Sequence, residues 1–402
     1  MSWKLPEEQE FDTVMRFIAD HAGDDVRRLS LDAPKYPHLD MAFVIDQIAG
    51  RRTAKIKLPQ WAATQNIIYP PHLSMEQCSS QATALYKASL VTGNSLVDLT
   101  GGLGVDFSFM AKRCEQATYV ERQELLCQIA SHNFAQLGLR AQVKCCDAIE
   151  HLNSMTEPVE TIYIDPARRD TLGNRVYGLG DCTPDVTQII DLMMKKSRRV
   201  IIKLSPMLDV SQALRQLPHV SHVHLVSIDN ECKELLLVID EPHCTHSPIV
   251  HCVNNGNDFT YSLSDKPAMA PVWDGDPTAP LFLYEPNASV MKAGCHNHIA
   301  QRFQVAAISR DSHLFVSHCP LTDFPGRGFV VDTVTSMNKR DLRLHLQGIT
   351  QANVATRNFP LHAPELARRL RLKDGGDIYI FATTLAGGQH ILLICHKNNP
   401  SS

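Results

Sequence analysis

The sequence predicts an α/β fold built on a parallel, doubly wound sheet that ends in an antiparallel pair of strands. From Asn94 to residue 204, five short apolar runs alternate with helical segments, which implies right-handed βαβ crossovers. Two later runs, 222–228 and 234–239, leave no room for a helix between them. We therefore expect a hairpin through Asp229-Asn230 at the end of the sheet.

The composition indicates a globular protein with reduced thiols. Hydrophobic residues make up 44% and charged residues 20% of the 402-residue chain, which excludes a disordered or collagen-like polymer. No apolar run approaches the roughly 18 residues that a membrane helix needs. The acidic N-terminal segment lacks the apolar core of a secretory signal. Twelve scattered cysteines without a CxxC pair favour a reducing compartment, so we expect a cytoplasmic protein with no membrane partner.

Local signals place the elements of the first half of the chain. Short helices are expected around 11–18 and 41–48, where apolar residues have helical spacing. Ser74-Met75-Glu76-Gln77 fits a capping box, which predicts one helix from there to about Val91, with Gly93 at its end. The five parallel strands are expected at 95–99, 117–121, 142–145, 161–164 and 200–204, with helices over 105–113 and up to Leu137.

The second half of the chain predicts two small α+β units. Residues 243–280 are rich in Pro, Asn, Asp and His and are expected to form a strand-poor connection. Asn287 is a plausible helix cap within a strand–helix–strand region that extends to 334. The remaining elements are expected as helix 338–346, strand 353–357, helix 363–370 and strands 377–384 and 389–396.

A glycine-rich turn carries the main chemical signal. Strand 95–99 delivers Asp98 into the turn, and the following helix begins near Asp106, which is either a ligand or a partner of the helix dipole. No Gly-Lys-Ser/Thr follows, so a Walker A loop is excluded, and the third glycine of a dinucleotide fingerprint would fall at Phe107. The turn therefore favours a ligand with a cationic amino-acid part, held at Gly101, Gly102 and Gly104.

Acidic residues follow three more strands of the predicted sheet. Glu121 ends the second strand, where a carboxylate can accept both hydroxyls of a ribose. Asp147 follows the third strand, where it can accept a hydrogen bond from an adenine amino group. Asp165-Pro166-Ala167-Arg168 follows the fourth. Ligands of open α/β sheets bind outside the carboxyl ends of the strands, so these residues are expected to share one edge.

With these motifs in this order, the chain resembles the class I S-adenosylmethionine-dependent methyltransferases, whose sheets end in such an antiparallel pair. More closely, it resembles bacterial methyltransferases with a C-terminal THUMP-like domain. The resemblance implies an N-terminal helical region (1–92), a Rossmann-like methyltransferase domain (93–242), a connector with a ferredoxin-like unit (243–334) and a THUMP-like domain (335–402). The segments that carry this closer resemblance are EQCSS (76–80), DLTGGLGVD (98–106), DPARRD (165–170), ECKELL (231–236), YEPN (284–287), DFPGR (323–327) and RNFP (357–360).

This resemblance implies S-adenosylmethionine as the cofactor and a methyl transfer for which Asp165, Pro166 and Arg168 are the catalytic candidates. Asp165 would orient or deprotonate the nucleophile. The segment departs from the (Asp/Asn)-Pro-Pro-aromatic motif of amino-methylating enzymes, because Ala167 and Arg168 replace the second proline and the aromatic residue. Arg168 and Arg169 are expected either to bind a phosphate or the substrate, or to form ion pairs with nearby acids. No cysteine lies in DPARRD or KLSP, so a covalent intermediate is not expected.

THUMP domains accompany RNA-modifying enzymes, so RNA is the expected partner by analogy, without an obligate protein partner. The sequence after position 330 has nine Lys/Arg and five Asp/Glu, which leaves the acidic remainder of the chain to account for the net charge of −4. The candidate RNA-binding residues are Arg368, Arg369 and Arg371. The alternative is that they form only a solvated face of their helix.

Two other functions remain open, a non-catalytic RNA-binding protein and a small-molecule methyltransferase. No metal site is expected, since the histidines and cysteines between 243 and 252 lack standard ligand spacing.

Overall fold

The computed structural model describes residues 5–70, 72–168, 179–217, 219–240, 247–277 and 280–398. The chain divides into two compact units, the first made of residues 1–223 and 233–246 and the second of residues 224–232 and 247–402. Among the described residues, no helix combines the length and apolarity needed to cross a bilayer.

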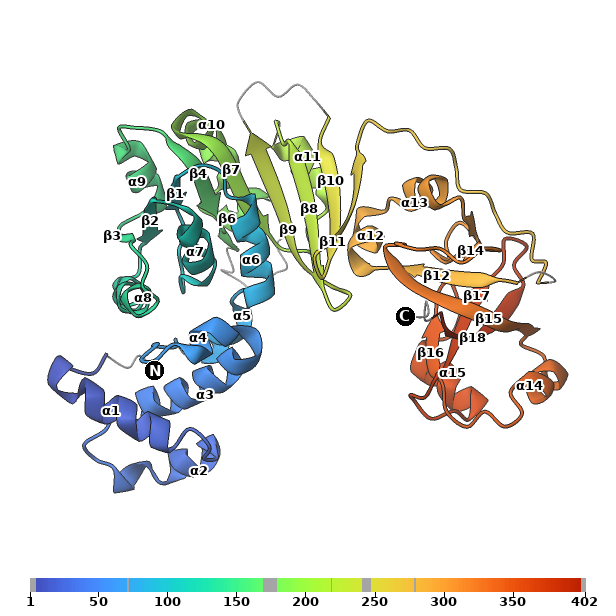
Figure 1. The fold of residues 1–402 in the computed structure, drawn as a ribbon, viewed down its shortest axis with the longest axis horizontal. Coiled ribbons are helices and arrows are strands. Elements are labelled where there is room, and N and C mark those ends of the chain that lie inside the picture. Colours follow the sequence, from blue (N-terminus) through green and yellow to red (C-terminus); the bar gives the residue numbers. More distant parts are fainter. Residues whose placement is uncertain are drawn as a thin grey trace. The chain divides into compact units, whose positions relative to one another are not determined.

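The N-terminal part of the first unit is helical, as the sequence predicts (Figure 1). Its helices have their own apolar core, which includes Phe43, Val44 and Ile48 and extends to Ile129 of a later helix. This shared core attaches the helices to the rest of the first unit. They are α1 (Glu8–Asp20), α2 (Val26–Leu31), the 3₁₀ turn η1 (Ala33–Lys35), α3 (Met41–Lys57) and α4 (Pro59–Ala63).

The single helix predicted from Ser74 to Val91 is wrong. The structure has two helices, α5 (His72–Gln77) and α6 (Gln81–Leu90), separated by residues 78–80. Ser80 caps α6, since its hydroxyl accepts a hydrogen bond from the Thr83 amide at 3.2 Å. The side chain of Ser74 lies outside the described residues. The break turns Ser79 inward to a buried polar cluster, and local capping signals do not report such a tertiary contact.

The sheet of the first unit has the predicted topology (Figure 1). Its strands follow the order β9-β7-β4-β1-β2-β3, and all neighbours are parallel except β7 and β9. The central strands are apolar and buried, as expected for a sheet covered on both faces. The strands are β1 (Ser95–Asp98), β2 (Gln116–Glu121), β3 (Gln142–Cys145), β4 (Val159–Ile164), β7 (Ser197–Leu204) and β9 (Glu231–Asp240).

The connections of this sheet also match the expected pattern. Strand β8 (His222–Ile228) is the neighbour of β9, and both residues of the Asp229-Asn230 turn have positive φ, as a two-residue hairpin requires. A short pair, β5 (Ala167–Arg168) and β6 (Cys182–Thr183), follows β4. The remaining elements are α7 (Val105–Met110), η2 (Ala111–Arg113), α8 (Glu124–Gln136), α9 (Ala148–Ser154), η3 (Leu179–Asp181), α10 (Val186–Lys196) and α11 (Val210–Gln216).

The strand-poor connection predicted for 243–280 is wrong in its first part. Strands β10 (Ile249–Asn254) and β11 (Asn257–Ser262) form an antiparallel hairpin in the second unit, and β10 is the neighbour of β8, so the sheet does not end at the predicted antiparallel pair. Its turn is Asn255-Gly256, where both residues have positive φ. Asn-Gly between alternating apolar residues is a hairpin signal that the polar composition of the segment concealed.

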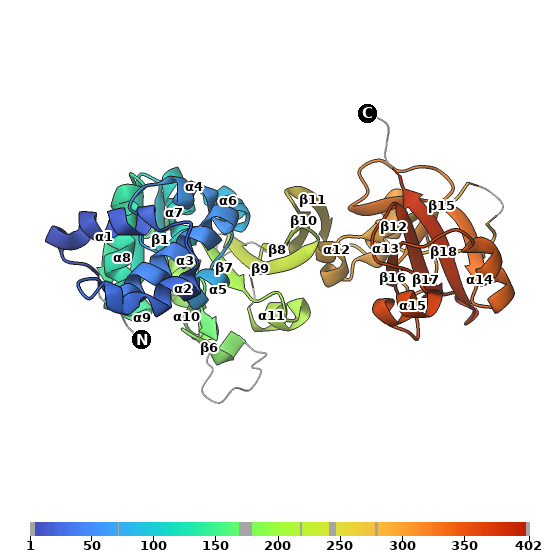
Figure 2. The same ribbon diagram turned by 90° about the horizontal axis from the view of Figure 1, so that it is seen from below.

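The second unit contains a further sheet, with strand order β13-β14-β12-β15-β18-β17-β16. Figure 2 shows its strands β12, β15, β18, β17 and β16. Asn287 caps α12, as predicted, and Asn338, expected as the first residue of a helix, caps α14. The predicted domain boundary at 334 falls inside β15. The elements are β12 (Phe282–Pro286), α12 (Ala288–Ala293), α13 (His296–Phe303), β13 (Ala306–Ala307), β14 (Phe315–Ser317), β15 (Gly326–Ser336), α14 (Lys339–His345), β16 (Asn353–Thr356), α15 (Ala363–Leu370), β17 (Ile378–Thr384) and β18 (His390–Lys397).

Candidate active site

The glycine turn between β1 and α7 lies directly against β2. The Gly101 amide donates to the Val120 carbonyl at 2.9 Å, which draws the turn onto the neighbouring strand. A Cβ atom at Gly101 would lie 2.1 Å from the buried ring of Tyr119, so no larger residue fits there. Gly104 starts α7 with φ of 74°, a conformation that favours glycine. These glycines allow the backbone to pass between the sheet and the open space in front of it.

Glu121 is joined to the same turn. One carboxylate oxygen accepts from the Gly102 amide at 3.1 Å, and the other accepts from the Gln123 amide at 2.9 Å. The structure therefore brings the end of β2 and the glycine turn together, as the sequence predicts. Glu121 is not among the residues that line the cavity in front of the turn, but its two partners Gly102 and Gln123 are.

A cavity of about 420 Å³ opens in front of the turn. Asp98 lines it but is almost fully buried, and the Thr100 amide donates to its carboxylate at 3.0 Å. Burial raises the pKa of Asp98 well above its usual range. A ligand ammonium group would oppose that shift. The other lining residues are Pro70, Gln77, Cys78, Ser79, Thr100, Gly101, Gly102, Leu103, Val105, Asp106, Gln123, Leu125, Leu126, Tyr163, Asp165 and Lys203.

Asp165 reaches the cavity from the end of β4. Its amide donates to the Thr100 hydroxyl at 2.6 Å, which fixes the strand end beside the glycine turn. Its carboxylate lies 2.7 Å from the Lys203 ammonium, and 40% of the Asp165 side chain is exposed. Burial raises the pKa of Asp165, and Lys203 opposes that effect. Pro166 is buried next to it.

Asp106 belongs to a buried cluster of charges on the inner wall of the cavity. Its Oδ2 accepts from the hydroxyls of Ser79 and Tyr163, each at 2.9 Å, and lies 3.4 Å from the Lys203 ammonium. Its Oδ1 lies 3.2 Å from the Lys87 ammonium. Burial alone would raise the pKa of Asp106, but Lys87 and Lys203, with the two hydroxyls, lower it to about 2.

Lys87 and Glu234 form the back of this cluster. The Lys87 side chain is completely buried and forms an ion pair with the carboxylate of Glu234, which is also buried. Ser79 lies between them, since its hydroxyl oxygen accepts from Lys87 at 3.2 Å and lies 3.2 Å from the Glu234 carboxylate, while its one proton is donated to Asp106 at the shorter distance. Through Lys203 the cluster extends to Asp165, so it holds two positive and three negative formal charges and has a net charge of −1.

Sequence reasoning assigned no role to Ser79, Lys87, Tyr163, Lys203 or Glu234. Two of them carried a readable signal, because a charge interrupts an apolar strand in Ile201-Ile202-Lys203-Leu204 and in Glu234-Leu-Leu-Leu-Val-Ile. A charged residue within a buried strand needs a partner, but the sequence does not identify that partner.

Other predicted site residues lie elsewhere. Asp147 is exposed, does not line the cavity and caps α9 through hydrogen bonds from the Ile149 and Glu150 amides. The side chain of Arg168 and all of Arg169 lie outside the described residues, as do His243 and His246. Arg368, Arg369 and Arg371 are exposed in the second unit.

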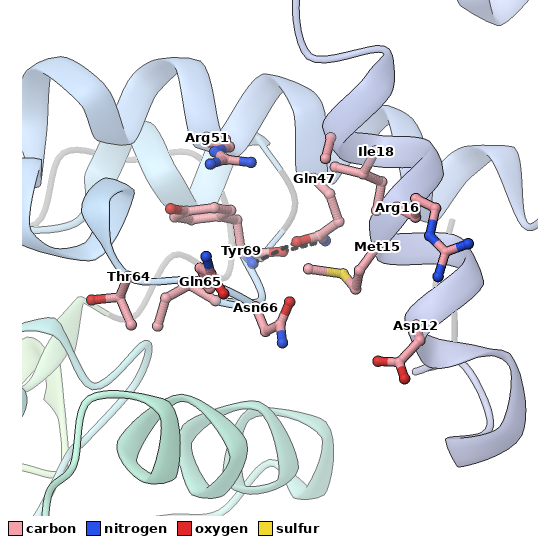
Figure 3. Close-up of a pocket in the computed structure, with 12 residues that line it drawn as sticks. Asp12, Met15, Arg16, Ile18, Gln47, Arg51, Thr64, Gln65, Asn66 and Tyr69 are labelled. Atoms are coloured by element: carbon pink, nitrogen blue, oxygen red, sulfur yellow. Dashed lines mark hydrogen bonds between the residues drawn. The ribbon is translucent and has the colours of Figure 1, made fainter.

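A second cavity, of about 360 Å³, lies between α1, α3 and the segment 64–69 (Figure 3). Gln47 donates to the Tyr69 carbonyl at 2.8 Å and accepts from the Tyr69 amide at 2.7 Å. Asn133 of α8 forms the same pair of hydrogen bonds with Ile68, accepting from its amide and donating to its carbonyl, both at 2.8 Å. Tyr69 leads directly into Pro70, so these two amides fix the chain where it enters the wall of the first cavity.

The fold and the cavity define a class I-type methyltransferase, with a glycine turn after β1, acids at the ends of β2 and β4, and the antiparallel strand β9 beside β7. Comparison with known proteins gives the family. A ferredoxin-like domain family matches residues 282–325, and a THUMP domain-like family matches residues 326–397. A candidate methyltransferase from Porphyromonas gingivalis W83, known from a crystal structure, is 30% identical in sequence to this chain. The match covers 98% of this chain and 100% of that protein, with a TM-score of 0.84.

An uncharacterized S-adenosylmethionine-dependent methyltransferase is known in two strains of Mycobacterium tuberculosis, CDC 1551 and H37Rv. In each it is 22% identical over 365 residues, which cover 88% of this chain and 92% of the relative. The chain therefore belongs to the family of S-adenosylmethionine-dependent methyltransferases with ferredoxin-like and THUMP-like C-terminal domains.

The cavity fits S-adenosylmethionine on structural grounds. At Gly102 nothing lies nearer than 3.8 Å to the position of an added Cβ atom, so the turn leaves open space for a ligand beside its backbone. Asp98 offers a buried acceptor for the cationic amino group. Glu121 offers carboxylate oxygens at the adjacent strand end.

Proposed function

We propose that this methyltransferase acts on RNA. The observation that carries the proposal is the cluster of exposed cations on the domain that matches the THUMP-like family. Arg368 and Arg369 lie in the last turn of α15, Arg371 follows it, and all three are exposed. Lys339, Arg340 and Arg343 are exposed on α14 of the same domain. The exposed cations of each helix outnumber its acids, Glu365 on α15 and Asp341 on α14, and such an excess favours contact with a phosphate backbone.

We further propose how the cavity residues divide the work. Gly101, Gly102 and Gly104 hold the methionine part of the cofactor through the backbone, and Asp98 accepts from its ammonium. Glu121 accepts from the ribose hydroxyls. Asp106 orders the inner wall through its contacts with Ser79, Tyr163 and the two lysines.

Two more predicted residues remain. Asp147, the predicted acceptor for the adenine amino group, does not line the cavity and caps α9, so it is left out of this assignment. Asp165, with Pro166 fixing the backbone beside it, orients the nucleophile of the substrate.

S-adenosylmethionine supplies an electrophilic methyl group when bound. The chain contributes mainly orientation, since in-line approach of the nucleophile to that carbon accounts for much of the rate of such a transfer. Asp165 is positioned for this task because Thr100 and Lys203 fix both its backbone and its carboxylate.

A salt titration of RNA binding tests the RNA proposal. Each phosphate contact on a single strand contributes about −0.7 to the slope of log K against log salt, so loss of three contacts should flatten the slope by about 2. The test protein replaces Arg368, Arg369 and Arg371 with Ala. A matched control replaces three exposed cations of the first unit, Lys55, Lys195 and Arg198, with Ala.

The expected result is weaker RNA binding and a flatter slope in the first variant alone, with unchanged affinity for S-adenosylmethionine. An unchanged slope would show that α15 presents only a solvated face. Labelled methyl retained on small-molecule extracts rather than on RNA would identify a small-molecule methyltransferase instead.

A further inference from the structure

Two groups of opposite charge lie side by side on the wall of the cavity. Asp165 and Lys203 come from the ends of adjacent strands, β4 and β7, and both line the cavity. Their charged atoms lie 2.7 Å apart, and their side chains are 40% and 16% exposed, respectively. An acceptor bound here therefore meets a carboxylate and an ammonium group at the same time.

The ammonium group of Lys203 is held in place from behind. Besides Asp165, it contacts the Ser79 hydroxyl at 3.1 Å and Asp106 at 3.4 Å. Lys203 remains protonated, because Asp106, Asp165 and Glu234 raise its pKa against the effect of burial. The contact with Asp106 is the longest of the three. If a substrate atom replaces Asp106 as a partner of Lys203, Asp106 retains its contacts with Ser79, Tyr163 and Lys87.

A nitrogen acceptor fits this pair poorly. An amine has one lone pair, which must attack the methyl carbon, and a neighbouring ammonium donor would compete for it. Among the described residues that line the cavity, the one aromatic side chain is Tyr163, which is fully buried and donates to Asp106, so no exposed ring is available to stack on a base.

A carbon acceptor fits poorly as well. Methylation of a pyrimidine carbon needs a thiolate to activate the ring. Cys78 is the one cysteine among the described lining residues. Its thiol donates to the Met75 carbonyl at 3.2 Å, and burial raises its pKa, which disfavours the thiolate.

A hydroxyl oxygen fits both groups. It has two lone pairs, so one can accept from Lys203 while the other attacks the methyl carbon, and its proton can pass to Asp165. We propose that the methyl acceptor is an alcohol hydroxyl held between Asp165 and Lys203. Given the proposed action on RNA, on which this step rests, the acceptor is the ribose 2′-hydroxyl, the alcohol that every internal nucleotide of RNA carries.

The reaction balances without another reactant. The oxygen–carbon bond forms as the carbon–sulfur bond breaks, and the electron pair of the latter passes to sulfur, which becomes a neutral thioether. The hydroxyl proton moves to the Asp165 carboxylate and then to solvent. Lys203 keeps its proton and stabilises the negative charge that develops on the oxygen.

Alkaline hydrolysis distinguishes this acceptor from a base. The unmodified full-length chain is incubated with methyl-labelled S-adenosylmethionine and total RNA from a strain that lacks the gene, and the RNA is then hydrolysed in alkali. Strand cleavage in alkali needs a free 2′-hydroxyl, so 2′-O-methylation leaves labelled dinucleotides that resist cleavage. The expected result is label in these dinucleotides.

Label in mononucleotides would show base methylation and overturn the hydroxyl assignment, while the RNA proposal would stand. Absence of label from RNA would overturn both proposals. Because this assay uses the parent chain, failure of a variant to fold cannot obscure it.

Variants test the two residues separately. Asp165→Asn should lower turnover by at least about 100-fold, within the usual contribution of a proton-transfer group. Lys203→Met should lower it by about as much, because it removes a donor that stabilises developing negative charge. Both variants should retain binding of S-adenosylmethionine. Lys195→Met, on an exposed face of α10, is the matched control and should keep full activity. Full activity in Lys203→Met would overturn the assignment.

Discussion

Replacing Lys87 with Met should destabilise the protein strongly, although Lys87 does not line the cavity. Its side chain is completely buried and pairs with the carboxylates of Glu234 and Asp106. Met fills a similar volume, so packing changes little. The variant therefore isolates the loss of one positive charge from a buried cluster that already has an excess of negative charge.

The magnitude follows from the cost of leaving a buried charge without its partner, about 3–5 kcal/mol in the free energy of unfolding. In a unit of this size, each kcal/mol lowers the melting temperature by about 2–4 °C, so the expected loss is roughly 6–20 °C. Lys203 still contacts Asp106, which should keep the loss from exceeding this range.

The effect should depend on pH with a definite sign. In the parent chain the pKa of Asp106 is lowered to about 2, so its stabilising contribution is complete well above its ordinary pKa of 3.8 and is lost as the pH falls toward 2. Without Lys87 that pKa rises, and the carboxyl group is protonated at higher pH. The difference between parent and variant should therefore be largest near pH 8 and shrink toward pH 4.

Thermal unfolding followed by circular dichroism at pH 8 and pH 4 measures both effects. Lys195→Met should change the free energy of unfolding by less than about 0.5 kcal/mol, as is usual for an exposed position. Lys87→Met combined with Glu234→Gln should recover part of the loss, because both charges of the pair are then absent. An unchanged melting temperature in Lys87→Met at pH 8, or a deficit that does not vary with pH, would refute the reasoning.

Three further predictions concern the cavity. Glu121→Ala should weaken binding of S-adenosylmethionine by about 1–3 kcal/mol in calorimetry, because ligand hydroxyls lose their acceptor, and NAD should not bind to the parent chain; unchanged affinity would remove Glu121 from the site. Gly101→Ala should lower stability by about 1–3 kcal/mol in urea unfolding, because the new Cβ overlaps the Tyr119 ring; a neutral result would mean that the ring can shift. Cys78→Ser and Cys182→Ser should each keep most of the methyltransferase activity, and a thousand-fold loss in either folded variant would favour a covalent intermediate.

The sequence alone determined the order and type of most elements in the sheet of the first unit. Alternation of apolar runs with helical segments is a local pattern, and the distance between 228 and 234 excluded a crossover helix. The glycine turn, Glu121 and Asp165 were also readable, because strand ends in such a sheet converge on one edge. The hairpin at 249–262 was missed although its Asn-Gly turn is local, since the polar composition around it was given more weight.

Tertiary structure decided the charged part of the site. Ser79 and Lys87 come from α6 and the residues just before it, Lys203 from β7 and Glu234 from β9. These three segments meet only because the fold packs them beside the glycine turn. The break between α5 and α6 has the same origin, because Ser79 must turn inward to join these charges. Helix caps and strand periodicity depend on neighbours in sequence, whereas a buried charge is stabilised by partners that the fold brings from far along the chain.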